Sequence, residues 1–481
     1  MFFNSLSFLI YLVVVFAIYW ALPNKLRCIF LLIASYYFYL FQNVTYAIPL
    51  LFVTLFSFVS ALIVGTEKEE SKRKGIFIFG IFFILVILIY FKYFNFFCSS
   101  AAFGLYRLGF SVRSFTVKVA LPIGISFYVF QSLSYLIDVY RKKVPAEKNL
   151  MFYATYLVFF PQLVAGPIER TEKLLSQIKQ EHKFDYDCAT YGLKQMLWGF
   201  FKKVAIADNI ASITKKIFEY SSVGDLEGSV FLFAAMLYSI QIYCDFSGYS
   251  DIAIGVAKLF GFNLSVNFKC PYFSQSIREF CNRWHITLSV WFRDYLYIPL
   301  GGNRKGKIRE YLNILIVFVL CGLWHGASWN FVWWGGIYGL ILVIEHFLFP
   351  EKLERKGGLV GFLRVIYVWI VSSLLWIVFA NDTDYALSHI FNHMFVGISD
   401  FGKYLEYGYR LLDIGDIARF SLLLNITILF VYDYFSMKND VIKFVSTRNV
   451  FLRWSIYIAF SLWVIMNVPF IEPSNFIYFR F

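Results

Sequence analysis

The stretch CGLWHGASWNFVWWGG (residues 321–336) decides how the chain is interpreted, because it places a histidine, His325, inside an apolar run of membrane-spanning character. An ionisable side chain in such a run is costly to bury and by default marks a functional site. The small residues Gly326, Ala327 and Ser328 keep the adjacent wall thin, so we expect a substrate to approach the ring closely. A neutral imidazole in such a pocket is a usual general base for acyl transfer. The alternative is a core histidine that is hydrogen-bonded to a neighbouring helix.

A second histidine, His285, lies upstream in SIREFCNRWHITLSVWFRDYLYIPLGG (276–302). This segment carries too many charges to span a bilayer, and its apolar and polar residues separate on a helical wheel. We therefore predict an amphipathic helix that lies at the membrane surface or dips into it. The apolar face contains Ile277, Phe280, Cys281, Trp284, Leu288, Trp291 and Tyr295, and the polar face contains Arg278, Asn282, His285, Ser289 and Arg293. The alternative is a solvated interfacial histidine without a catalytic role.

The composition of the whole chain is that of a polytopic membrane protein. Of its 481 residues, 59% are hydrophobic, 22% are aromatic and only 16% are charged, whereas a soluble chain carries about 25% charged residues. The net charge of +13 does not indicate nucleic-acid binding, because the basic residues fall in short clusters between apolar runs, as the positive-inside rule predicts. The 7 cysteines are scattered and include no C-x-x-C pair, so we expect neither a disulfide framework nor a metal site.

Apolar runs of about 20 residues, the length that spans a bilayer, recur along the chain. We predict an all-α fold with about eleven spans, in which residues 1–481 form a single membrane-embedded domain. Three weaker segments, 150–166, 188–206 and 251–262, are predicted to be re-entrant or tilted. The predicted spans are 5–22, 28–43, 46–64, 76–97, 119–138, 228–243, 311–323, 328–349, 360–380, 418–435 and 451–470.

Two further segments depart from simple spanning helices. FFPQLVAGPIER (159–170) places two prolines at the end of an apolar run, and irregular backbone is tolerated at membrane depth only where protein buries it or a watery cavity meets it. QIYCDFSGYSDIAIG (241–255) places Asp245 and Asp251 in another apolar region. We expect these acids to hold structure through hydrogen bonds rather than to catalyse.

Four motifs, in this order, resemble the membrane-bound O-acyltransferase family, and within it the bacterial branch that includes alginate O-acetyltransferase. They are FFPQLVAGPIER (159–170), YCDFSGYSDIAIG (243–255), CNRWHITLSVWFRDYLYIPLGGNR (281–304) and LWHGASWNFVWWG (323–335). The resemblance covers roughly residues 121–343. It implies a ring of helices around a central funnel or tunnel, which a cytoplasmic acyl-CoA enters from one side and an acceptor hydroxyl from the other.

The resemblance also implies roles for individual residues. The family's near-invariant histidine falls on His325 and its second polar position on His285. His325 would take the proton of the acceptor hydroxyl, and His285 or nearby donors would orient the thioester carbonyl or relay the proton. No cofactor is expected beyond acetyl-CoA as donor substrate, whose phosphates would bind arginine and lysine at the inner mouth. The arginines available there are Arg278, Arg283, Arg293 and Arg304. The residues expected to line the funnel or bind substrate are Trp324, Ser328, Asn282, Arg278, Arg283 and Asp245.

The end of the chain, FIYFRF (476–481), supports a further hypothesis. It is either an interfacial aromatic belt or a relay in which Tyr478 receives the acyl group. A similar C-terminal aromatic motif occurs in envelope acylation systems of the family, where its tyrosine resembles an acyl relay. A phenol (pKa about 10) leaves nearly as well as a thiol (pKa about 8.5), so transfer to Tyr478 would keep the acyl group activated.

We therefore predict a multi-pass O-acetyltransferase of the bacterial cytoplasmic (inner) membrane, which passes acetyl from acetyl-CoA towards a periplasmic or cell-surface polysaccharide. The lipid bilayer and a periplasmic or surface acetyltransferase are its expected partners. One alternative is D-alanyl transfer towards teichoic acid from a carrier-protein thioester. Another is a proton-coupled transporter or flippase in which buried His and Asp residues relay protons. The absence of visible internal symmetry argues against the transporter.

Overall fold

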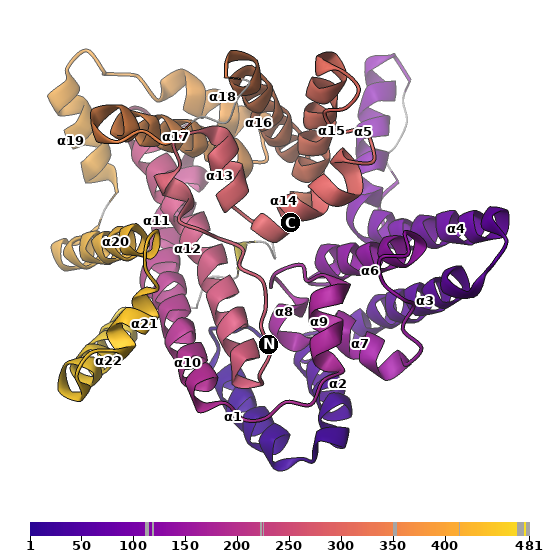
Figure 1. Ribbon diagram of the computed structural model, residues 1–481. Helices are drawn as coiled ribbons and strands as arrows, with labels where there is room; N and C mark the ends of the chain where they lie inside the picture. The colour runs from indigo at the N-terminus through magenta and orange to yellow at the C-terminus, as the bar shows by residue number, and fades with distance from the viewer. Residues whose placement is uncertain are drawn as a thin grey trace. The chain divides into compact units, whose positions relative to one another are not determined.

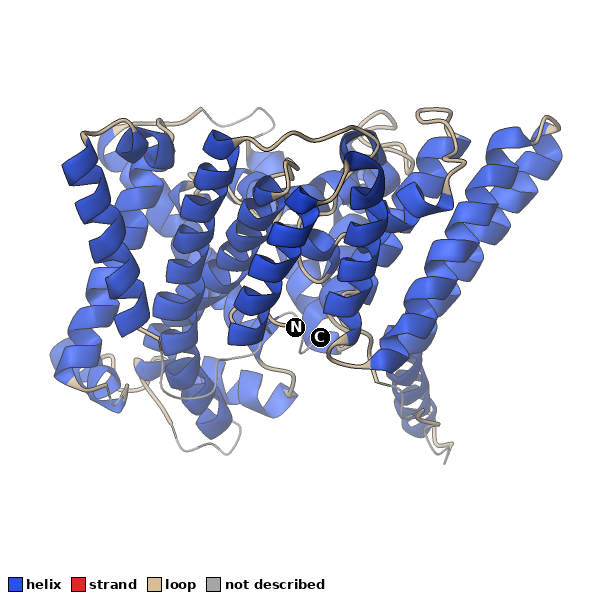
Figure 2. Ribbon diagram, turned by 90° about the horizontal axis from the view of Figure 1, so that it is seen from below, coloured by secondary structure: helices blue, strands red, loops and turns tan. Residues whose placement is uncertain are grey.

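The computed structural model describes most of the chain: residues 1–110, 115–117, 120–221, 224, 226–349, 354–412, 414–468 and 476–477. These residues form helices joined by loops and contain no strand (Figure 1, Figure 2). The predicted all-α class is therefore confirmed. The hypothetical acyl relay, Tyr478, lies outside the described residues.

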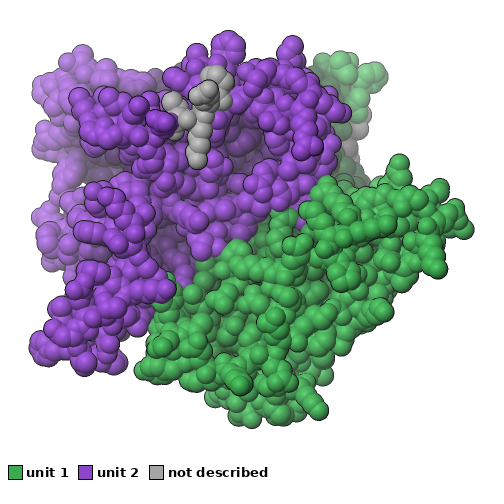
Figure 3. Space-filling view, viewed as in Figure 1, with its two compact units in different colours: residues 1–193, 253–265 green, residues 194–252, 266–481 purple. Residues whose placement is uncertain are grey.

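The helices group into two compact units, which Figure 3 colours separately. Each unit is made of two stretches of chain: 1–193 with 253–265 in unit 1, and 194–252 with 266–481 in unit 2. Helices α10 (Tyr186–Phe200) and α12 (Val230–Leu259) contribute residues to both units. The expectation of a single membrane-embedded domain over residues 1–481 stays a prediction.

Unit 1 begins with long apolar helices and continues with short ones. Its helices before α10 are α1 (Leu6–Ala21), α2 (Asn24–Leu40), α3 (Ala47–Thr66), α4 (Glu70–Leu88), α5 (Phe94–Arg107), α6 (Ile125–Tyr140), α7 (Leu150–Val158), α8 (Phe160–Leu163) and α9 (Thr171–Ile178). Helix α3 packs against α4 and α6, and α2 packs against α7. A π-helical turn, η2 (Ile89–Tyr93), joins α4 to α5 without a break.

Unit 2 carries most of the resemblance motifs. Its further helices are α11 (Asp208–Ser221), α13 (Ile277–Arg283), α14 (Ile286–Phe292), α15 (Lys307–His325), α16 (Trp329–Leu348), α17 (Gly358–Ala380), α18 (Asp384–His393), α19 (Phe401–Leu411), α20 (Asp416–Ser436), α21 (Val441–Ser446) and α22 (Val450–Met466). Helices α15 and α16 form a closely packed hairpin, against which α13 and α17 pack through α16. The π-helical turns η3 (Phe201–Ala207) and η5 (Arg293–Tyr297) extend α10 and α14.

Glycines allow the α15–α16 hairpin to close. A Cβ atom at Gly322 would lie 2.1 Å from the carbonyl oxygen of Phe331, and one at Gly335 would lie 2.2 Å from that of Phe318. No side chain fits at these distances, so the two backbones approach each other directly. Small residues serve close helix contacts of this kind in membrane proteins.

The chain is a multi-pass membrane protein, as its composition predicts. Among the described residues, 7 helices are long and apolar enough to cross a bilayer: Val44–Thr66, Glu70–Arg107, Val230–Leu259, Lys307–His325, Trp329–Leu348, Gly358–Ala380 and Asp416–Ser436. Helices α1 and α22 are apolar but shorter. The predicted segments 228–243 and 251–262 belong to one helix, α12. The larger number of spans and their ring arrangement stay predictions.

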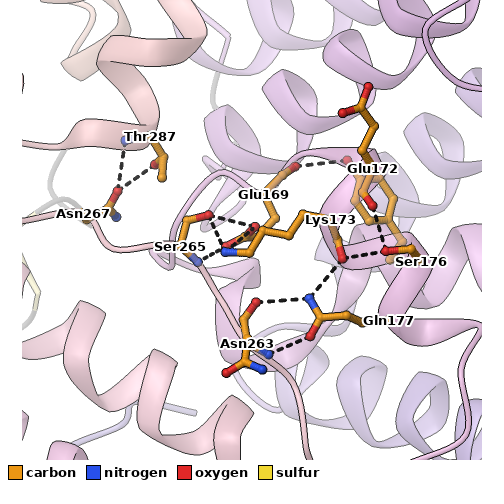
Figure 4. A network of polar contacts seen from close by, with 10 residues as sticks. Glu169, Glu172, Lys173, Ser176, Gln177, Asn263, Ser265, Asn267 and Thr287 are labelled. Carbon is orange, nitrogen blue, oxygen red and sulfur yellow. Dashed lines mark hydrogen bonds and ion pairs between the residues drawn. The ribbon is translucent and has the colours of Figure 1, made fainter.

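The segment 159–170 is irregular, as predicted, and protein buries it. After the four-residue helix α8 the chain makes a turn and a short non-helical stretch. That stretch is held by Glu169, a carboxylate with 0% exposure that accepts hydrogen bonds from the backbone N–H and the hydroxyl of Ser265. The ammonium group of Lys173 lies 3.8 Å from the same carboxylate (Figure 4).

The prediction of one continuous amphipathic helix over residues 277–295 is wrong. Helix α13 ends at Arg283 and α14 begins at Ile286. Between them His285 has a φ of +43°, in the left-handed region that a right-handed helix of L-residues excludes. The side chain of His285 is buried rather than solvated. A helical wheel assumes a constant rotation per residue, so this break reorients every side chain that follows it.

Candidate active site

Unit 2 contains a cavity of 460 Å³ that is lined by α13, α14, α15 and α16 and by Trp376 of α17. Both predicted catalytic histidines contribute to its wall. Of the predicted site residues, four line the cavity, namely His325, His285, Asn282 and Arg278, whereas Trp324, Ser328, Arg283 and Asp245 lie outside its described lining. The fold thus brings two histidines from separate motifs to the wall of one cavity.

His325 is the last residue of α15, and its side chain is buried. Its ring centroid lies 5.1 Å from that of Trp324, 5.1 Å from that of Trp334 and 5.5 Å from that of Phe379, with interplanar angles between 76° and 86°. Edge-to-face contacts of this kind are favourable and restrict the orientation of a ring. The imidazole is therefore held by aromatic side chains, of which Trp334 also lines the cavity.

The small residues after His325 serve the packing of the hairpin. A Cβ atom at Gly326 would lie 2.1 Å from the ring of Phe331. Ser328 is the N-cap residue of α16, although its side chain makes no capping hydrogen bond. The ring of Phe331 therefore leaves no room for a side chain at position 326. This finding corrects the expectation that Gly326 leaves space for a substrate.

His285 is positioned by hydrogen bonds to a neighbouring loop. The backbone N–H of Ile286 donates to the carbonyl of Asn267 at 2.9 Å, and the hydroxyl of Thr287 donates to the Asn267 side-chain oxygen at 2.6 Å. A non-glycine residue in such a backbone conformation costs of order 1–3 kcal/mol and persists only where its surroundings over-determine it. Strain of this kind is common at functional sites, and here it turns an imidazole towards the cavity.

The environment of His285 keeps its imidazole neutral. Its ring centroid lies 4.6 Å from that of Phe246 and 5.7 Å from that of Trp324. Burial lowers the pKa of His285 to about 3, so the ring is uncharged at neutral pH and has one nitrogen able to donate and one able to accept. Because Trp324 also contacts His325, this indole touches both histidines.

A polar cluster occupies another part of the cavity wall. The guanidinium of Arg278 is hydrogen-bonded to His346, whose Nε2 lies 3.2 Å from a carboxylate oxygen of Glu310, and Lys307 lies 3.2 Å from the other oxygen. Glu345 accepts the first N–H groups of α13 at 3.0 and 2.8 Å. Sequence reasoning missed Glu310, Glu345 and His346, although ionisable residues near the ends of apolar helices were the available signal.

Arg283 makes contacts outside the cavity lining. Its guanidinium lies 2.8 Å from Glu279, and Arg355 lies 2.7 Å from the same carboxylate. An arginine in such a pair is less available to the phosphates of a donor than Arg278, which lines the cavity. Of the predicted phosphate-binding arginines, Arg278 and Arg293 belong to the cavity wall.

Asp245 and Asp251 form ion pairs with buried lysines, and sequence reasoning missed these partners. Lys203 lies 2.7 Å from Asp245 and 2.8 Å from Asp208, while Lys202 pairs with Asp251. These pairs agree with the structural role expected for the acids. Two adjacent lysines inside the apolar segment 188–206 were the sequence signal, because a buried cation needs a carboxylate partner.

Two thiols also line the cavity, those of Cys281 and Cys321. Burial raises the pKa of the Cys281 thiol, which keeps it protonated, whereas the thiolate is the nucleophilic form. The neutral imidazole of His285 is therefore better suited than this thiol to accept a proton. The chemistry that the wall supports best is general-base activation of a hydroxyl in a largely apolar space.

The sequence is similar to those of known proteins. Residues 140–382 match the profile of MBOAT, the membrane-bound O-acyltransferase family. The probable alginate O-acetylase of Azotobacter vinelandii is 37% identical over 442 residues, which cover 90% of this chain and 85% of that protein. The peptidoglycan O-acetyltransferase of Helicobacter pylori is 32% identical, covering 71% and 70% respectively. The teichoic acid D-alanyltransferase of Streptococcus thermophilus is 28% identical, covering 49% and 61%.

Proposed function

The chain belongs to the membrane-bound O-acyltransferase family, and on that premise we propose that it transfers acetyl from acetyl-CoA towards a hydroxyl of an extracytoplasmic polysaccharide. The observation that carries the proposal is that His285 and His325 line the same cavity. Two relatives are O-acetylating enzymes named for the glycans alginate and peptidoglycan, which supports acetyl as the group and a glycan as the acceptor. The acyltransferase family also favours an enzyme over a transporter.

His325 is the proposed general base. Its imidazole takes the proton of the acceptor hydroxyl as the oxygen attacks the thioester carbonyl carbon, which forms a tetrahedral intermediate. The C–S bond then breaks, the CoA sulfur leaves with the proton that His325 held, and the acceptor carries an ester. General-base catalysis by a positioned side chain contributes typically about 10² to 10⁴-fold in rate.

His285 is the proposed second polar group of the reaction. As a neutral ring it can donate a hydrogen bond to the carbonyl oxygen while negative charge develops there. A donor directed at such an oxyanion in a site that excludes water contributes about 3 kcal/mol. The contacts with Phe246 and Trp324, together with the left-handed backbone, hold the ring in one orientation before substrate arrives.

The polar cluster around Arg278 is the proposed contact for the charged part of the donor. Arg278 and Arg293 line the cavity, and arginine binds phosphate groups through charge-assisted hydrogen bonds. In this proposal Trp324, Ser328, Arg283 and Asp245 support the wall rather than contact substrate. Trp324 would act by holding the two imidazoles in place, because its ring contacts both.

We place this reaction in the bacterial cytoplasmic membrane, in a ring of about eleven spans around a thinned centre. Acetyl-CoA would reach the cavity from the cytoplasm, and a periplasmic or surface acetyltransferase would complete delivery to the polymer. Tyr478 is the proposed carrier of the acetyl group between the two. Its replacement by phenylalanine should abolish a covalent acetyl mark on the C-terminal peptide, which mass analysis of that peptide would detect.

A donor screen tests the proposal. Purified protein is incubated with labelled acetyl-CoA, and separately with a D-alanyl thioester on a carrier protein, and release of free thiol is followed. We expect thiol release from acetyl-CoA by the natural sequence and none above background by a folded His325→Ala variant. Equal release by that variant would refute His325 as the base.

The same screen separates the remaining alternative. Release from the D-alanyl carrier alone would replace acetyl transfer by D-alanyl transfer, while both reactions would use the same cavity. The extent of the matches favours acetyl, because the D-alanyltransferase match covers 49% of this chain and the alginate O-acetylase match covers 90%.

A further inference from the structure

The last described residues of the chain, Phe476 and Ile477, are buried in unit 2, with 2% and 5% exposure. The backbone N–H of Ile477 donates a hydrogen bond of 2.7 Å to the Oδ2 atom of Asp245 on α12. A specific contact with a buried charge thus holds this segment.

The carboxylate of Asp245 belongs to a buried charged cluster. Its Oδ1 atom lies 2.7 Å from Lys203, which lies 2.8 Å from Asp208, and the three side chains are at most 4% exposed. One ammonium group and two carboxylates carry a net negative charge. In an environment of low polarity a carboxylate oxygen requires a donor, and the N–H of Ile477 supplies one to Oδ2, the other oxygen of Asp245.

Aromatic contacts connect the same segment to the candidate active site. The ring of Phe476 stacks on Tyr249 at 4.7 Å and lies 5.6 Å from Phe246. Phe246 in turn lies 4.6 Å from His285. Because Asp245 and Tyr249 are four residues apart on α12, they share one face of that helix. The face that binds the segment therefore lies beside the residue that contacts His285.

We propose that Asp245 is a positioning residue that anchors the C-terminal segment on α12, one aromatic ring away from His285. Its carboxylate divides its two oxygens between Lys203 and the backbone of Ile477, and Phe246 and Tyr249 hold the adjacent phenylalanine. The effect of this anchor on acetyl transfer rests on the proposed function, whereas the anchoring itself can be measured without any acyl chemistry.

The decisive variant is Asp245→Asn. An asparagine has only one accepting oxygen, and Lys203 would take it, so the amide NH₂ group would face the N–H of Ile477. We expect the Ile477 amide to exchange with deuterium about tenfold faster or more, because it loses a hydrogen bond to a charged acceptor. Fragment-resolved mass spectrometry of the full chain in detergent measures this rate.

A matched control is Asp208→Asn. It removes the same charge beside the same lysine but leaves both oxygens of Asp245 in place. We expect the exchange of Ile477 to stay at the rate of the natural sequence. Equal exchange at Ile477 in the natural chain and the Asp245→Asn variant would overturn the proposal, and so would equal acceleration in both asparagine variants.

Three variants of the segment itself keep the test conclusive if the replacement at Asp245 prevents folding. Phe476→Ala removes the stacking on Tyr249 but leaves α12 unchanged, so the exchange of Ile477 should accelerate. Ile477→Pro removes the donated N–H, whereas Ile477→Ala keeps it. The proline variant should therefore release the segment, seen as faster cleavage near residue 476 by added protease, and the alanine variant should release it less. Equal cleavage of both would contradict the hydrogen bond.

Activity then separates positioning from a merely structural role. Asp245→Asn should lower acetyl transfer about as much as Ile477→Pro, a variant that keeps Tyr478. In the Ile477→Pro chain the same replacement should have no further effect, because the hydrogen bond through which Asp245 positions the segment is already lost. A further loss in the Ile477→Pro chain would show that Asp245 acts by another route. If the natural sequence does not transfer acetyl, the proposed function fails and the exchange result still decides the anchor.

Discussion

The two histidines that line the cavity are held in opposite ways. His325 ends a regular helix of 19 residues, and its ring is enclosed by aromatic side chains. His285 lies in a break between two helices of 7 residues each, with a backbone conformation that L-residues rarely adopt. The first is placed by helix packing, and the second by hydrogen bonds that the next two residues, Ile286 and Thr287, donate to Asn267.

This difference shows that burial and orientation are separate requirements. A continuous helix can bury a side chain, but it also fixes the direction in which that side chain points. At His285 the helix is interrupted instead, which costs of order 1–3 kcal/mol. Because the ring of His285 is both buried and turned towards the cavity, we infer that its orientation matters to the reaction.

The largest expected effect distinguishes the two histidines by activity. His325→Ala should lower the rate of acetyl transfer about 10³-fold, because a general base is lost. His285→Ala should lower it roughly 10² to 10³-fold at most, because one oxyanion donor is lost. Initial rates at saturating acetyl-CoA measure both. Full activity of the His325→Ala variant would refute the role of His325 as the general base.

The next effect tests the close backbone contact between α15, the helix that ends at His325, and α16. Gly335→Ala should destabilise the protein by about 3 kcal/mol, because overpacking at a backbone contact forces the hairpin apart. Gly336→Ala is the matched control, since a Cβ atom there would meet only Val319 at 3.8 Å. Thermal unfolding in detergent compares them, and equal midpoints would mean that the hairpin contact can relax.

The next prediction is that His285 makes the stability of the folded protein depend on pH. Because burial lowers the pKa of His285 to about 3, the unfolded chain binds one more proton than the folded chain between that value and the usual pKa of about 6.5. Stability is therefore fully present above about pH 6.5 and falls as the pH is lowered through this window, by about 2 kcal/mol at pH 5. A His285→Asn variant should lack this part of the acid sensitivity in thermal unfolding. An unchanged pH slope would show that the ring is protonated while folded.

The smallest expected effect concerns backbone conformation. At position 285 glycine should be more stable than alanine by about 1 kcal/mol, because a left-handed residue is strained unless it is glycine. At position 325 the order should reverse by about 0.5 kcal/mol, because glycine is less favourable than alanine in a helix. Unfolding midpoints of the four variants measure this crossover. The same order at both positions would remove the contrast between the two histidines.

Much of the site was accessible from residue types alone. A histidine in an apolar run indicated His325, and the family resemblance of an amphipathic segment indicated His285. Acids in an apolar region indicated that partners must exist for Asp245. The sequence did not show that Lys203 is that partner, because the two residues lie on different helices. The helical wheel failed at His285 because hydrogen bonds to Asn267, which is distant in sequence, stabilise the break.

The amino-acid sequence alone determined that this chain is helical and membrane-embedded, since about 20 apolar residues in a row suffice for a span. It also indicated the family and the histidine chemistry. Only the tertiary structure decided that both imidazoles meet one cavity, that His285 leaves the helix, and that Asp245 binds the N–H of Ile477. The reason is physical: span formation depends on local hydropathy, whereas these contacts depend on pairs of groups that only the packed helices bring together.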